Sequence, residues 1–179
     1  VRLDIDIIAP VIGIKFNNNK DNNGNTYFDN KRTAMVTINE RNHHFDAATA
    51  TKGIIINAVD AKGNPVENAY IISDWTTVDN ENPDLATHTA EIRFEKDANY
   101  TWSIAYTDEA GNANEGVKLA EGTVAAFDFT VDMTAPTGTV KATSHEGRTD
   151  EWHALRDSLT FGFWSKKKIT ITGASYDAT

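Results

Sequence analysis

Apolar and polar residues alternate with a period of two along most of the chain, which is the pattern of half-buried β-strands. The most regular stretch is 99–107, where Tyr100, Trp102, Ile104 and Tyr106 fall on one face and small polar residues on the other. Strands are predicted in the same way at 11–16, 32–39, 53–59, 70–75, 88–95 and 126–132. About seven short strands with almost no helical periodicity predict an all-β sandwich.

Two of these segments carry further expectations. The run 53–59 (GIIINAV) is β-branched and nearly continuous, so it predicts a strand covered on both faces. The following DAKGNP sequence predicts a hairpin turn with Gly63 at positive φ. Segment 40–50 is polar around Phe45 and predicts a loop or a single helical turn.

A sequence repeat frames the alternating region. Laying Leu3 on Phe129 also places Asp6 on Asp132, Pro10 on Pro136 and Lys15 on Lys141, at a constant offset of 126 residues. Each copy is an alternating segment, an Ala-Pro that interrupts a sheet ladder, and a second alternating segment. The repeat predicts that 1–9 is the last strand of one module, 10–135 a complete module and 136–179 the opening strands of a third.

The third segment is predicted to be a variant of the complete module. Residues 166–179 can be laid on 32–49, with Ile169 and Ile171 on Val36 and Ile38. Before them, Thr149 or Asp150 is suited to capping a short helix, which would place three apolar residues on one side. These residues are Trp152, Leu155 and Leu159.

Charge and cysteine content narrow the possible partners. The chain has a net charge of −9, and residues 10–135 alone hold 19 acidic and 10 basic residues. An acidic surface repels phosphate backbones, so nucleic acid is not an expected partner. The absence of cysteine excludes disulfides, zinc-thiolate sites and thiol nucleophiles. No apolar run is long enough for membrane insertion of this segment.

Candidate metal ligands are few. Asn19, Asp21, Asn23 and the glycine at 24 fit the start of a calcium loop, but the twelfth position is Asn30, which lacks the expected carboxylate. An asparagine-rich loop tip is the alternative. Asp132, like Asp6, adjoins an Ala-Pro junction, where a carboxylate can bind Ca²⁺ or simply face solvent. No cofactor and no metal site is therefore assigned.

No catalytic pattern is present. The chain lacks G-x-S-x-G, a phosphate-binding loop and H-E-x-x-H, and its carboxylates form no recognisable pair. The adjacent His43 and His44 point to opposite sides of an extended chain and cannot chelate together. The expectation is a protein that is not an enzyme, with no catalytic residues.

Three motifs resemble bacterial immunoglobulin-like (Ig-like) repeats. The run DANYTW (97–102) is similar to the D-x-[GA]-x-Y-x-C corner of Ig-like domains, with Trp102 in the place of the cysteine. The pair YTDEAGN (106–112) and FTVDMTAP (129–136) resembles the endings of tandem bacterial Ig-like repeats. YFDNKRTAMVTINERNHHFD (27–46) resembles their second-strand region in Gram-positive surface proteins.

The resemblance implies a stiff spacer or adhesion scaffold in a large extracellular protein, attached to the cell wall or secreted. Its partners would be neighbouring modules of the same chain and an unidentified host, matrix or glycan ligand. An accessory carbohydrate-binding module of a secreted glycoside hydrolase is the alternative, and it requires exposed aromatic residues among Trp75, Trp152 and Trp164. A phage or pilus module, in which strands pair between chains, is a third possibility.

Overall fold

The structure of the protein is a computed structural model that describes residues 5–20, 26–41, 45–79, 85–144 and 169–176. The chain divides into a larger unit that ends at Met133 and a smaller unit that begins at Thr134. The two units are described separately.

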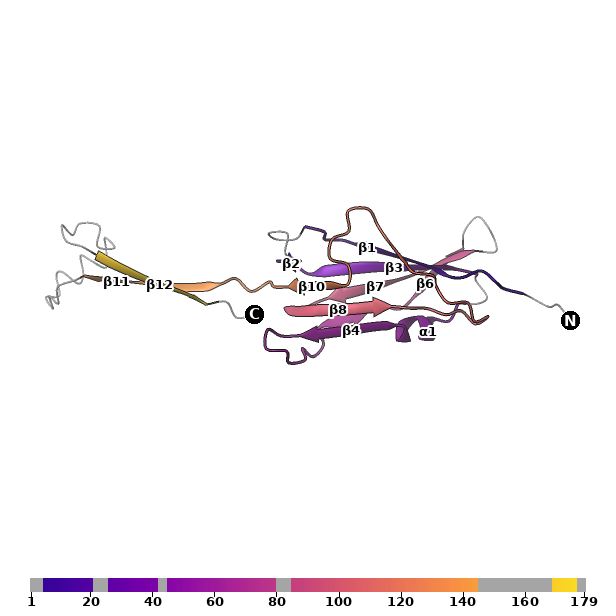
Figure 1. The fold of residues 1–179 in the computed structure, drawn as a ribbon, viewed down its shortest axis with the longest axis horizontal. Coiled ribbons are helices and arrows are strands. Elements are labelled where there is room, and N and C mark those ends of the chain that lie inside the picture. Colours follow the sequence, from indigo (N-terminus) through magenta and orange to yellow (C-terminus); the bar gives the residue numbers. More distant parts are fainter. Residues whose placement is uncertain (1–4, 21–25, 42–44, 80–84, 145–168, 177–179) are drawn as a thin grey trace. The chain divides into compact units, whose positions relative to one another are not determined.

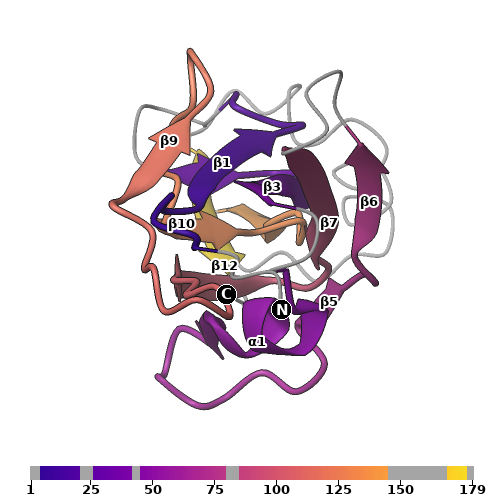
Figure 2. The ribbon, with the colours of Figure 1, turned by 90° about the vertical axis from the view of Figure 1, so that its right-hand side faces the viewer.

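One sheet of the larger unit is built around the hydrogen-bonded strands β1, β3 and β7. The strand order is β5-β7-β3-β1-β9, and β6 pairs with the same strand, β7, as β5 does. Figures 1 and 2 show this sheet from two sides. All its pairs are antiparallel except β1 with β9. The strands are β1 (Val11–Phe16), β3 (Arg32–Glu40), β5 (Tyr70–Ile72), β6 (Thr76–Asp79), β7 (Ala86–Phe94) and β9 (Val117–Leu119).

The other sheet has the order β2-β10-β8-β4, with β2 and β10 parallel. Its strands are β2 (Tyr27–Phe28), β4 (Ile54–Val59), β8 (Ala98–Ile104) and β10 (Asp128–Val131). A six-residue helix, α1 (Ala47–Lys52), connects the two sheets between β3 and β4. Of the two forms expected for segment 40–50, a loop or a single helical turn, the structure has a short helix that begins at Ala47. Gly63 has the predicted positive φ, 82°.

The predicted alternation forms the core between the two sheets. The side chains of Tyr100, Trp102, Ile104 and Tyr106 are all buried, while the residues between them are exposed. Phe94 of β7 lies against the rings of Tyr100 and Phe129, at centroid distances of 5.0 and 4.9 Å. Two packed sheets with alternating inward residues confirm the predicted all-β sandwich.

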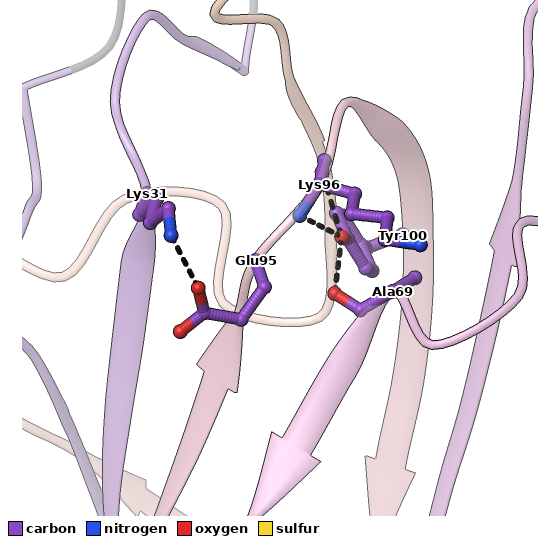
Figure 3. Close-up of polar contacts among 5 residues, drawn as sticks. All are labelled: Lys31, Ala69, Glu95, Lys96 and Tyr100. Atoms are coloured by element: carbon purple, nitrogen blue, oxygen red, sulfur yellow. Dashed lines mark hydrogen bonds and ion pairs between the residues drawn. The ribbon is translucent and has the colours of Figure 1, made fainter.

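Tyr100 forms the predicted corner (Figure 3). Its hydroxyl lies 2.7 Å from the carbonyl oxygen of Lys96 and 2.9 Å from that of Ala69, and it accepts a hydrogen bond from the Lys96 backbone N–H. Burial raises the pKa of Tyr100 to about 12. The tyrosine thus joins the entry of β8 to the segment before β5, beside an ion pair between Lys31 and Glu95.

Arg32 is a fully buried charge in this core. Its guanidinium carbon lies 3.8 to 4.4 Å from the ring centroids of Phe16, Phe28 and Phe129. Its nitrogens donate to the carbonyl oxygens of Val124 and Ala125, each at 2.8 Å. Aromatic faces and carbonyl groups together replace water around the cation, so Arg32 fastens the segment before β10 to β3.

The prediction that 53–59 is covered on both faces was wrong. β4 is an edge strand, because β8 is the one strand of the described residues that pairs with it, and Ile55 is 67% exposed. A run of β-branched residues favours a strand, but it does not fix the strand's place in the sheet. β4 carries its inward side chains at Ile54 and Ala58.

The smaller unit is a two-stranded antiparallel hairpin of β11 (Thr137–Ser144) and β12 (Ile169–Tyr176). β11 lies where the 126-residue offset places a copy of β1. Gly138 pairs with Ser175, whereas the predicted alignment would have paired it with Ile171, so the register differs by four residues. That alignment matched apolar residues alone and carried no information on register. The predicted helix after 149 lies outside the described residues.

Candidate functional site: the end of the sandwich that receives residues 5–9

Residues 5–9 run into β1 without forming a strand of their own. They meet the sandwich at the end where β3 finishes at Glu40 and where the turn 108–112 follows β8. This end of the molecule is called the entry end below. It collects most of the charged and polar groups that the described part of the chain buries.

The turn 108–112 (DEAGN) is held by a set of side-chain and backbone hydrogen bonds. The carboxylate of Asp108 accepts from the backbone N–H of Asn112 at 2.7 Å and from its side-chain amide at 2.9 Å. Gly111 closes the turn at φ 94°, a conformation that glycine adopts without strain. The amide of Asn112 is therefore held in a fixed orientation.

That amide binds the incoming chain. Asn112 Nδ2 donates its second hydrogen to the carbonyl oxygen of Asp6 at 3.2 Å. The carboxylate of Asp6 in turn accepts from the backbone N–H of Ile8 at 3.0 Å. Residues 6–8 thus have a defined path onto the sandwich although they belong to no sheet.

Three carboxylates meet beside this contact. One oxygen each from Asp6, Glu40 and Asp108 lies within 4.8 Å of the other two, and Glu40 and Asp108 are only 2% and 5% exposed. Glu40 also accepts a hydrogen bond from the backbone N–H of Arg41 at 2.6 Å. Carboxylate oxygens are the ligands that Ca²⁺ and Mg²⁺ prefer, so these three residues are the ones in the described ranges that are placed to hold a hard cation.

A buried aromatic cluster lies next to the carboxylates. The rings of Phe45 and His88 stack at 3.7 Å, and Phe45 also contacts Trp75 and Tyr106 at centroid distances of 5.4 and 5.5 Å. The Nδ1 atom of His88 lies 2.8 Å from the hydroxyl oxygen of Thr77. The cluster closes the core at the entry end.

The start of α1 is tied to the same cluster. Tyr106 accepts a hydrogen bond from the backbone N–H of Asp46 at 2.9 Å, and Asp46 caps the helix by accepting from Ala48 N–H and the Thr49 hydroxyl. The Thr49 hydrogen bond, followed by that of Ala48, lowers the pKa of Asp46 below 3.8. Burial raises the pKa of Tyr106 above 10.0, and the nearby carboxylates of Glu40 and Asp108 act in the same direction.

The opposite end of the sandwich, called the exit end, binds the chain where it leaves. Met133 follows β10, and its backbone N–H donates to Oδ1 of Asp97 at 2.9 Å. Asp97 lies in the turn between β7 and β8, directly after Lys96 of the tyrosine corner.

Of the predicted calcium ligands, the structure describes only Asn19 and Asp132. The side chain of Asn19 faces the protein, where its oxygen lies 3.5 Å from a guanidinium nitrogen of Arg32 and 3.4 Å from the Val124 nitrogen. Asp21 and Asn23 lie outside the described residues. Asp132 sits at the exit end, where its backbone N–H donates to the carbonyl oxygen of Phe28.

Only Asp6 among the junction carboxylates is part of the observed group. Glu40 and Asp108 were missed because they are 68 residues apart in sequence and share no motif. The AGN sequence after Asp108 did indicate a turn, and it was the one sequence feature that could have pointed to Asp108.

The described residues include no helix that is long and apolar enough to cross a membrane. Comparisons of the chain with protein-family models, curated proteins and solved structures found no match.

Proposed function

We propose that this chain is part of a tandem array of Ig-like modules from a large bacterial surface protein, and that the array serves as a stiff spacer and adhesion scaffold. The observation that carries the proposal is the bound chain at each end of the sandwich, which falls at the same position of the 126-residue repeat.

The strand order supports the Ig-like part of the proposal. If β1, β3, β4, β5 with β6, β7, β8 and β10 are taken as seven successive strands A to G, one sheet has the order D-E-B-A and the other G-F-C. Apart from β9, which extends the first sheet beside A, and β2, which extends the second sheet beside G, this order resembles that of constant-type Ig domains. The Tyr100 corner at the start of strand F adds a second, independent resemblance.

Burial at equivalent positions supports the tandem arrangement. Val131 of β10 is fully buried, whereas its counterpart at an offset of 126, Ile5, is 68% exposed. Exposure of an apolar residue at a repeated core position is expected if residues before Pro10 belong to the core of a preceding, similar module.

The stiffness of the proposed spacer comes from the short, bound junctions. The two ends of a flexible linker adopt a wide range of distances from each other. Residues 6–8, in contrast, are held by hydrogen bonds at the entry end. Ordered junctions would carry a distal ligand-binding tip away from the cell, and the acidic modules would repel one another. The proposed location is extracellular, on the wall or secreted.

A spin-label experiment tests the stiffness. The chain has no cysteine, so the double variant Ile5→Cys with Ile55→Cys carries only the two intended labels, both at exposed positions. We expect a single narrow distance distribution by pulsed electron paramagnetic resonance. A distribution as broad as that of a disordered tail would contradict the spacer role.

A second experiment tests the location. Antibodies raised against the chain should label intact cells or the culture medium of the organism that carries the gene. Labelling that appears only after the cells are permeabilised would contradict a surface or secreted protein.

The carbohydrate-binding alternative gains no support from Trp75. Its ring packs on Phe45, and its indole N–H donates to the hydroxyl of Thr51 at 3.0 Å, so the residue belongs to the packing at the entry end. Trp152 and Trp164 lie outside the described residues.

A further inference from the structure

The two ends of the sandwich bind the same repeated position of the chain through different atoms. At the entry end, Asn112 donates to the carbonyl oxygen of Asp6. At the exit end, Asp97 accepts from the backbone N–H of Met133. The offset of 126 that relates Asp6 to Asp132 also relates Ile7 to Met133.

The two bound atoms are the carbonyl and the N–H of peptide groups at equivalent positions of the repeat. The carbonyl of residue 6 and the N–H of residue 7 are joined by a single peptide bond, as are the carbonyl of Asp132 and the N–H of Met133. We propose that this peptide group is a two-sided docking point between modules. Its N–H is bound by the aspartate at position 97 of the module before, and its carbonyl by the asparagine at position 112 of the module after.

The chemistry of a peptide group permits both contacts at once. The structure has no cis peptide bond among the described residues, so the N–H and C=O of this group point in opposite directions. One donor and one acceptor can then bind from opposite sides without competing. Because the group is planar, fixing both atoms also fixes its orientation.

The two binding groups differ in how they are positioned and in charge. The Asn112 amide is oriented by Asp108, as described above, and has one hydrogen left for the Asp6 carbonyl. Asp97 offers a carboxylate oxygen, and a hydrogen bond to a charged acceptor is stronger than one between neutral groups. The partner of each end is therefore a second copy of this module, and the inference rests on the proposed tandem arrangement.

The chain contains a natural control for the Asn112 contact. The turn 60–64 (DAKGN) has the same hydrogen bonds as the turn 108–112, with Asp60 accepting from Asn64 N at 2.8 Å and from Asn64 Nδ2 at 2.9 Å. Gly63 and Gly111 have similar φ angles of 82° and 94°. Within the described residues, however, the Asn64 amide makes no second contact to another segment. Asn64→Ala thus removes the turn bonds without removing a docking contact.

The test uses a tandem chain in which residues 1–132 are followed directly by residues 7–179. This fusion keeps the spacing of the repeated junction, with Ile7 in the place of Met133, and contains the described module twice. Spin labels at Ile55→Cys in each copy report the distance between the modules. Hydrogen exchange of the Ile7 amide that follows Asp132 reports the docking bond itself.

We expect a narrow distance distribution for the parent tandem. Asp97→Ala in the first copy and Asn112→Ala in the second should each broaden the distribution, and Asp97→Ala should speed exchange of the junction amide by about tenfold or more. Asp97→Asn keeps an acceptor oxygen and should keep the narrow distribution. Asn64→Ala in the second copy should leave both readings at the parent values.

The outcomes separate the two proposals. If the parent distribution is narrow and neither alanine variant changes it, the modules are stiffly joined by other contacts and the two-sided peptide is refuted. If the parent distribution is already broad, the spacer function fails and the docking proposal fails with it. If Asn64→Ala broadens the distribution as much as Asn112→Ala, loss of turn stability explains the effect and the docking contact is refuted.

Discussion

Replacing Tyr100 with phenylalanine isolates the corner hydroxyl from the packing of the ring. The ring contacts with Phe94 and Phe129 are kept, while the Lys96 and Ala69 carbonyl oxygens and the Lys96 N–H lose their buried partner. Leaving buried polar groups unpaired costs about 1 to 3 kcal/mol. We expect Tyr100→Phe to lower the free energy of unfolding at pH 8 by that amount.

The same hydroxyl gives the stability a distinctive pH dependence. An unfolded tyrosine titrates at 10.0 and folded Tyr100 at about 12, so the folded state holds this proton more tightly. The stability from the neutral phenol is complete below pH 10 and is lost as the pH rises to 12, a loss of about 2 to 3 kcal/mol. The difference between the parent and Tyr100→Phe should therefore shrink towards zero across this window.

Urea denaturation followed by circular dichroism at pH 8, 10 and 12 measures both effects. Tyr27→Phe is the matched control, because this half-exposed side chain lies outside the core and its loss should change the unfolding free energy by less than about 0.5 kcal/mol. The reasoning is refuted if Tyr100→Phe behaves like the control at pH 8, or if its difference from the parent is the same at pH 8 and pH 12.

Three further predictions concern stability. Gly53→Ala would place a Cβ 1.9 Å from the carbonyl oxygen of Ala105, so it should push residue 53 away from residue 105 and lower the thermal midpoint, whereas an unchanged midpoint would contradict the close approach. Arg32→Met leaves the partly buried Val124 and Ala125 carbonyl groups without this donor and should lower the unfolding free energy by about 1 to 3 kcal/mol in urea titrations, whereas an unchanged value would contradict the role of Arg32. Asp46→Ala removes the cap of α1; because the folded pKa of Asp46 is lowered, its contribution exists above about pH 4 and fades on acidification. The urea midpoints of parent and variant should thus differ at pH 7, and the difference should become smaller as the pH falls below 3.8; a constant difference would argue against the ionised cap.

Alternation was a reliable guide wherever a strand had one face in the core. The strands around 11–16, 32–39 and 99–107 formed as expected, because a period of two fixes which residues point inward. The corner was expected from the resemblance of DANYTW to the corner of Ig-like domains, and the Tyr100 hydroxyl does bond to the Lys96 carbonyl four residues earlier. Local sequence therefore predicted which side chains point inward and one side-chain contact.

Features that depend on distant parts of the chain were not predictable in this way. β9 is three residues long and pairs in parallel with β1, which lies more than 100 positions earlier in the chain. No local sequence pattern predicted this strand. The carboxylate group of Asp6, Glu40 and Asp108 likewise forms only when three separate segments reach the same end. β4 lies at a sheet edge because, among the described residues, it has a neighbouring strand on one side and none on the other. The sequence of a strand does not by itself indicate how many neighbouring strands it will have.

The neighbours with which the first and last core strands each pair determine how the sandwich responds to tension. Force applied through the two chain ends enters at β1 and leaves at β10, which lie in different sheets and are pulled towards opposite ends. Each is held laterally by neighbours on both sides, β3 with β9 and β2 with β8. The load therefore acts along the strands and across whole rows of hydrogen bonds, which must slide and break together. Such loading in shear resists extension far better than opening one bond at a time, so the topology favours a domain that stays folded while it is stretched.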